Sequence, residues 1–146
     1  MNCMGYILGR DEDMLPKCWS LETYNKVSQF INQNTEGEEV ALEIRLRMID
    51  EILATMVAAE FCSQYQWREI ITTPTKAPEG TVALRVGTVG LFSDFHFAIK
   101  SEIDGETCWL HKPGQCSVDI MFDDEIAAPE WDGGYRTTVR YFQKIK

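Results

Sequence analysis

The stretch that decides the fold spans residues 95–111, with the sequence Phe-His-Phe-Ala-Ile-Lys-Ser-Glu-Ile-Asp-Gly-Glu-Thr-Cys-Trp-Leu-His. Its two ends are rich in the aromatic and β-branched residues that favour strands. The pair Asp104-Gly105 between them favours a two-residue hairpin turn, because both residue types tolerate a positive φ. We therefore expect antiparallel strands over 95–100 and 107–110.

Other segments of the same half of the chain add to this sheet. Residues 71–80 contain two prolines, which remove backbone donors and restrict their neighbours, so this segment is expected to be a loop. Further strands are predicted over residues 81–86, 117–121 and 135–142. Together with the hairpin they give an antiparallel sheet of about five strands.

The first half of the chain predicts helices instead. Asn2 and Ser20 are suitable N-caps, because their side-chain oxygens accept from amides that the first helical turn leaves free. Helices are expected over residues 2–8, 21–32 and 38–65, the last with an apolar face of Ala41, Ile44, Met48, Ile52 and Met56. The sequence therefore predicts an α+β fold in which N-terminal helices pack on a C-terminal antiparallel sheet, as one domain over 1–146.

Composition restricts the partners. The chain has 23 acidic and 14 basic residues, a formal net charge of −9, which repels nucleic acid and anionic membranes. No segment reaches the ~20 apolar residues of a membrane span, and the first ten residues lack the features of a signal peptide. We expect a cytoplasmic protein with its five scattered cysteines reduced, while non-classical export or a phage origin stays open.

A cysteine and the chain's two histidines suggest nucleophilic catalysis. A thiolate attacks carbonyls, but a cysteine with an ordinary pKa of about 8.5 is mostly protonated at neutral pH. Cys3 opens the first predicted helix, whose N-terminus favours negative charge, and His96 is expected to face it and take its proton. His111, one strand later, or alternatively Asp119, would orient His96.

The spacing of the two histidines leaves a small mismatch. Residue 96 lies eight positions before Asp104, whereas residue 111 lies six positions after Gly105. With a strict two-residue turn, the histidines are therefore near each other but not opposite. We expect a longer turn or a bulge to align them.

Several of these residues resemble one family. Residues 2–6, Asn-Cys-Met-Gly-Tyr, resemble the Asp-Cys-Ser-Gly-Phe motif of NlpC-type papain-like cell-wall amidases. The strands that carry His96 and His111 are similar to that family's sheet. Residues 109–114, Trp-Leu-His-Lys-Pro-Gly, are similar to the Trp-Ser-His-Lys-Pro-Gly signature of a divergent bacterial and phage subgroup.

The resemblance implies a papain-like cysteine amidase or peptidase without a cofactor or metal. In this interpretation Cys3 is the nucleophile, His96 the base and His111 the orienting residue. The substrate is an amide bond of a cell-wall peptide or of a protein side chain. Asn2, Tyr6 and Trp109 are expected to contribute to substrate binding. The chain departs from the family in its early nucleophile and in the long helix between Cys3 and the sheet.

Other interpretations remain open. Cys3 and His96 are also compatible with purely structural roles, in which case the chain is a binding or inhibitor protein that keeps the fold without the chemistry. Cys108, His111 and Cys116 have the side-chain types of zinc ligands, but their spacing fits no known zinc module. The sequence gives no indication of the oligomeric state.

Overall fold

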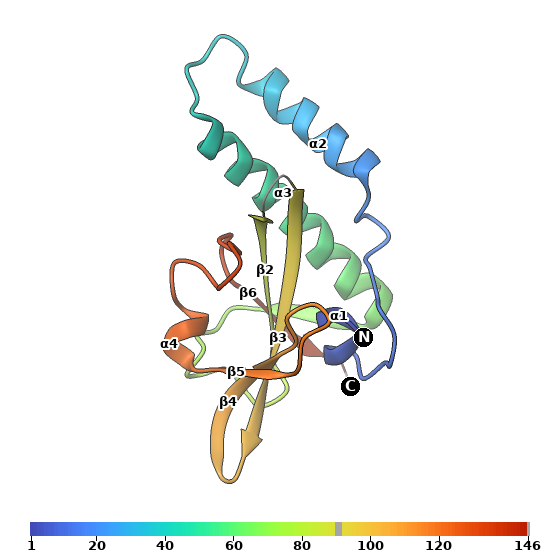
Figure 1. Cartoon of the computed structure of the whole chain (residues 1–146), viewed down its shortest axis with the longest axis vertical. Helices are drawn as coiled ribbons and strands as arrows, with labels where there is room; N and C mark the ends of the chain where they lie inside the picture. The colour runs from blue at the N-terminus through green and yellow to red at the C-terminus, as the bar shows by residue number, and fades with distance from the viewer. Residues whose placement is uncertain (90–91, 146) are drawn as a thin grey trace.

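A computed structural model describes residues 1–89 and 92–145 of the chain. In chain order, its elements are α1 (Cys3–Ile7), α2 (Leu21–Asn34), α3 (Leu42–Tyr65), β1 (Trp67–Ile70), β2 (Val82–Val89), β3 (Phe92–Ile103), β4 (Glu106–His111), β5 (Asp119–Met121), α4 (Asp123–Ile126) and β6 (Arg140–Lys144). Figure 1 shows α2 and α3 as a pair of helices that extends from one side of the sheet. The predicted α+β class is confirmed.

The sheet is antiparallel and has the strand order β1-β6-β2-β3-β4-β5. Its six described strands exceed the predicted number because β1, which follows α3 after the left-handed residue Gln66 (φ 58°), was not expected. The short helix α4 was not expected either. The last strand begins at Arg140, so the strand predicted from Tyr135 is wrong over its first five residues.

The hairpin that joins β3 and β4 has the predicted two-residue turn. Ile103 pairs with Glu106 around Asp104 (φ 52°) and Gly105 (φ 81°). Both turn residues have the positive φ that a type I′ turn requires, which an Asp-Gly pair adopts at low cost. This turn fixes which residues of β3 and β4 lie side by side.

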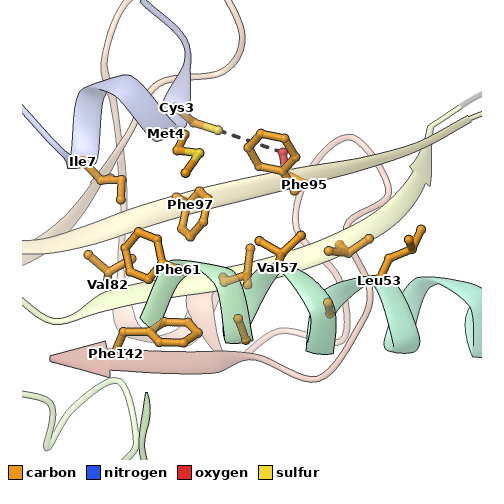
Figure 2. Packing of buried hydrophobic residues seen from close by; sticks show 14 of the residues in the cluster. Cys3, Met4, Ile7, Leu53, Val57, Phe61, Val82, Phe95, Phe97 and Phe142 are labelled. Atoms are coloured by element: carbon orange, nitrogen blue, oxygen red, sulfur yellow. Dashed lines mark hydrogen bonds between the residues drawn. The ribbon is translucent and has the colours of Figure 1, made fainter. Parts of the chain in front are cut away.

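Helix α3 covers one face of the sheet with a different stripe from the one predicted. The side chains that it buries include Ile49, Leu53, Val57 and Phe61, which recur every four residues. Figure 2 shows Leu53, Val57 and Phe61 of this stripe along the side of the sheet that carries Phe97, with Phe61 close to both Phe97 and Phe142. In the predicted face, Ile44 and Met48 are exposed, whereas Ile52 and Met56 are partly buried against the edge of the core. Periodicity alone does not say which of two neighbouring apolar stripes meets the sheet.

The other face of the sheet is covered by α4 and by the segment 127–139 that leads to β6. Its buried residues are Ala77, Ala83, Ala98, Trp109, Met121, Ile126, Trp131 and Tyr141. The segment passes very close to β2, because a Cβ added to Gly87 would lie 1.9 Å from the carbonyl oxygen of Gly134. This covered face carries His96, and so it contains the candidate site.

Candidate active site

Cys3 is the first residue of α1, as predicted. The Asn2 Oδ1 atom accepts hydrogen bonds from the Gly5 and Met14 amides, each at 3.0 Å, so Asn2 caps the helix and ties it to the following loop. Helix α1 packs against β3 and β4. The Cys3 sulfur lies 4.0 Å from the carbonyl oxygen of Phe95, as the dashed line in Figure 2 shows.

The Cys3 thiol is not activated in this resting structure. Only 5% of the residue is exposed, and burial raises its pKa from the ordinary value to about 12. The Phe97 amide lowers the pKa of the thiol, whereas the Asp94 carboxylate raises it further. We expected the helix N-terminus and an imidazolium to lower this pKa, but desolvation of the buried thiolate is the largest effect, and no histidine is among the groups that shift the pKa.

The two histidines meet directly on the covered face of the sheet. The Nε2 atom of His96 lies 2.8 Å from the Nδ1 atom of His111, with the rings nearly perpendicular. His111 is opposite Ala98, so the two rings are diagonal neighbours on adjacent strands. Such neighbours are within reach of long side chains, and the expected longer turn or bulge is absent from this hairpin.

Aromatic rings enclose the imidazole of His96. The ring of Tyr135 stacks on it with centroids 5.1 Å apart, and the ring of Trp131 meets it edge to face at 6.0 Å. The Tyr135 hydroxyl donates to Asp94 at 2.7 Å. Burial lowers the pKa of His96 to about 3, with a smaller contribution from His111, so His96 is a neutral imidazole at physiological pH.

Cys3 and His96 approach β3 from different sides. The side chains of Phe95 and Phe97 belong to the helix-side core together with Cys3, whereas His96, between them in sequence, belongs to the opposite face. The sulfur nevertheless interacts with the backbone of both residues that flank His96, through the Phe95 carbonyl and the Phe97 amide. The expectation that His96 faces Cys3 is therefore wrong in this structure, because the thiol of α1 and the imidazole of β3 lie on opposite faces of the sheet.

A pocket of about 520 Å³ opens beside the two histidines. Besides His96 and His111, it is lined by Asp94, Pro113, Gly114, Asp119, Ile120, Met121, Glu125, Ala128, Glu130, Trp131, Asp132, Gly133 and Tyr135. Cys3 is not among its lining residues. The predicted catalytic pair is thus divided between a pocket-facing imidazole and a thiol packed in the core.

The other predicted site residues have different outcomes. Trp109 is fully buried and its indole donates to Asp123, and Tyr6 packs against the helix-side core, so neither lines this pocket as expected. Asp119 lies opposite His111 on β5 and raises the pKa of His111, although burial lowers the pKa of that ring overall. Asp119 therefore adjoins His111, and it is His111 whose ring contacts His96.

The zinc interpretation lacks an assembled ligand set in the structure. Over residues 1–89 and 92–145, no three His, Cys, Asp or Glu side chains are arranged to hold a metal ion. Cys108 is buried and Cys116 is exposed, while the Nδ1 atom of His111 faces His96.

Sequence reasoning did not identify the residues that enclose His96. Trp131 and Tyr135 lie on either side of Asp132-Gly133-Gly134, in a segment that was expected to be a strand from Tyr135 onward. Gly133 and Gly134 have φ values of 100° and 96°, which only glycine adopts readily, so this pair was the available signal for a turn. Arg85, opposite His96 on β2, gave no signal in the sequence.

No family model, curated protein or solved structure matches this chain. The similarity to NlpC-type amidases therefore remains a prediction that depends on the short motifs around Cys3, His96 and His111. Within the described part of the chain, none of the helices combines the length and apolar character needed to cross a membrane.

Proposed function

We propose that this protein is a cysteine-dependent amidase or peptidase. In this proposal Cys3 is the nucleophile, His96 the general base and acid, and His111 the residue that orients His96. The observation that carries the proposal is the 2.8 Å contact between His96 Nε2 and His111 Nδ1, at the point of β3 against which the Cys3 sulfur packs.

The proposed roles require one arrangement of protons on the two neutral rings. His96 donates through Nε2–H to the Nδ1 atom of His111, which leaves the Nδ1 atom of His96 as an acceptor. Nδ1 is also the ring nitrogen nearer the backbone of β3, and the sulfur contacts that backbone at the Phe95 carbonyl oxygen from the other face. The His111 contact thus selects the tautomer that is able to accept a proton from Cys3.

The reaction then proceeds by acyl transfer. His96 takes the thiol proton as the Cys3 sulfur bonds to the carbonyl carbon of the substrate, and the Cys3 backbone amide helps to stabilise the oxyanion. His96 next gives its proton to the leaving amine, which breaks the amide bond and leaves a thioester. Water, activated by His96, hydrolyses the thioester to an acid and restores the thiol.

The acidic side chains of the pocket act on His111. Asp119, Glu125 and Asp132 each raise the pKa of His111, which opposes the effect of burial on that ring. Burial and His111 lower the pKa of His96 itself, so a proton that His96 accepts is held weakly and is readily given to the leaving amine. Because Cys3 is buried and lies on the opposite face of β3 from His96, the proposal requires a rearrangement on substrate binding that uncovers the thiol and brings it to the imidazole.

The pocket also suggests the class of substrate. Its described lining residues include no Lys or Arg. They include five carboxylates, those of Asp94, Asp119, Glu125, Glu130 and Asp132. This lining favours a peptide that carries an amine near the scissile amide, with Trp131 and Tyr135 as additional partners for a cation. Cell-wall peptides with a diamino acid have this chemistry.

We further propose that the protein acts where thiols stay reduced, as in the cytoplasm. All five cysteines are free in the structure, and the proposed chemistry needs Cys3 as a thiol.

Trapping of the thioester tests the proposal. The protein is mixed with synthetic cell-wall peptides containing lysine or diaminopimelate, quenched in acid and examined by peptide-mapping mass spectrometry. We expect an acyl adduct on Cys3 and release of the amine product. Cys3→Ala should abolish both, whereas Cys18→Ala, which removes another partly buried thiol, should retain both. Amine release that persists in Cys3→Ala would exclude the proposed nucleophile.

A binding function is the second candidate. The observation in its favour is that the Cys3 thiol is buried, has a raised pKa and does not line the pocket. In that case the acidic pocket binds an amine-containing peptide without cleaving it. Calorimetric titration with the same peptides would show saturable binding, with no product and no adduct after prolonged incubation.

A further inference from the structure

Arg85 is a buried cation beside the candidate site. Only 3% of the residue is exposed, although it lies on β2 directly opposite His96 of β3. Opposed residues of antiparallel strands project to the same face, so the guanidinium lies on the covered face with His96. A cation in such a place needs partners, because burial of an unpaired charge is costly.

All the partners of the guanidinium belong to one segment. Its Nε, Nη1 and Nη2 atoms donate to the carbonyl oxygens of Thr137, Ala128 and Pro129 at 2.8, 2.6 and 2.5 Å. The group also lies 5.6 Å from the ring centre of Trp131. No carboxylate pairs with Arg85 among the described residues. The side chain therefore fastens both ends of the 127–139 segment to the sheet.

The fastened segment carries the rings that cover His96. Trp131 donates through its indole to Ile126, and its backbone amide donates to the Tyr135 carbonyl. These bonds close a tight turn that places the Trp131 and Tyr135 rings against the imidazole. Any loosening of the segment would admit water to His96.

We propose that Arg85 is a positioning residue for His96, which it holds dry and correctly oriented by clamping the segment 127–139 over it. The inference rests on the proposed function and assigns a supporting residue to the proposed general base, His96. Lysine offers one nitrogen instead of a planar group with three separate donors, so it cannot reproduce the clamp although it keeps the charge.

Several titratable groups besides Arg85 line the pocket beside His96 and His111. They are His111 from β4, Asp94 from β3, Asp119 from β5, Glu125 from α4, and Glu130 and Asp132 from the clamped segment. Arg85→Lys keeps a cation among these groups whereas Arg85→Gln removes it, so this pair of variants separates the clamp from the simple effect of the cation.

Histidine titration by NMR tests the inference. The chain has only two histidines, so a His111→Asn variant assigns their ring signals. We expect the pKa of His96 to rise by about one unit or more in Arg85→Lys and Arg85→Gln alike, because water reaches the ring in both. If only Arg85→Gln raises it, the arginine acts as a charge and the inference is wrong. Arg68→Lys, on the remote strand β1, is the matched control.

A second variant covers the case in which Arg85 variants do not fold. Trp131→Phe keeps an aromatic cover but loses the indole bond to Ile126 and reduces the surface on which the guanidinium lies. It should raise the pKa of His96 less than full exposure would, and an unchanged pKa would overturn the inference. These readings do not depend on cleavage, so a failure of the proposed function, seen as absent acyl adduct, is distinguished from a failure of the clamp.

Discussion

The Nε2 atom of His96 lies 2.8 Å from the Nδ1 atom of His111, although the two residues are not opposite each other in the sheet. The strict two-residue turn at Asp104-Gly105 sets this diagonal relation, since a shift of the register by one residue would turn His111 to the other face. The turn therefore determines which nitrogen of His96 contacts His111.

The first prediction concerns this contact. In the proposed tautomer, His111→Ala leaves the buried Nε2–H of His96 without an acceptor, which costs about 1–3 kcal/mol. If that cost falls on the proposed reaction, kcat/KM for the cleaved peptide decreases about ten- to hundredfold. His111→Asn supplies a carbonyl oxygen as acceptor and should retain more activity than His111→Ala. Equal activity in the two variants would argue against the orienting role.

The second prediction concerns the carboxylate of Asp94, which acts on the Cys3 thiol. Burial is the largest cause of the raised Cys3 pKa, and Asp94 adds to it. Asp94→Asn removes that charge, so the pKa of Cys3 should fall and its alkylation by iodoacetamide at pH 8 should accelerate about two- to tenfold. Labelling is followed by peptide-mapping mass spectrometry, with Cys18 as an internal reference. Asp119→Asn, which alters the His111 end of the pocket, should leave the Cys3 rate unchanged.

The third prediction concerns pH and stability. The pKa of His96 is lowered to about 3 by burial and by His111, from an ordinary value of 6.5. Between these values the unfolded chain binds more protons than the folded one. Above pH 6.5 the neutral His96 should therefore not reduce the free energy of unfolding. As the pH falls from 6.5 toward 3, the free energy of unfolding should decrease, by a few kcal/mol in total.

Urea unfolding at pH 7.5, 6, 5 and 4 measures this dependence. His96→Gln removes the titrating group, and its stability should decrease less steeply over the same range. Asp50 acts in the opposite direction, because burial raises its pKa and its neutral form is favoured in the folded state. The difference between wild type and His96→Gln removes that contribution. Parallel curves for the two proteins would mean that His96 is solvated.

The features of the site that depend on nearby residues were predictable from the sequence. Asn2 and Ser20 cap α1 and α2 as predicted, because capping depends on a side chain and an amide only three residues apart. The Asp104-Gly105 turn was equally local. These features predicted that His96 and His111 lie on neighbouring strands, and their contact follows from that register.

Features set by distant parts of the chain were not predictable in the same way. The burial of Cys3 depends on Phe95 and Phe97, some ninety residues away, and reverses the expected effect of the helix N-terminus on its pKa. The cover over His96 comes from Trp131 and Tyr135, which Arg85 holds through backbone carbonyls that carry no sequence signal. Tertiary packing therefore decided the electrostatics of both predicted catalytic residues.

The last prediction concerns the close approach of this cover to the sheet. A Cβ at Gly87 would lie 1.9 Å from the Gly134 carbonyl oxygen, so Gly87→Ala must push the segment away from β2. We expect a loss of about 1–3 kcal/mol in urea unfolding and a rise in the pKa of His96, because Tyr135 moves with Gly134. Gly80→Ala is the control: it has open space around the new Cβ and a φ of 86°, so backbone strain of about 1–2 kcal/mol should destabilise it without changing the His96 titration. A Gly87→Ala protein that loses stability but keeps the wild-type His96 pKa would show that the segment yields elsewhere and that the stacked ring of Tyr135 stays in place.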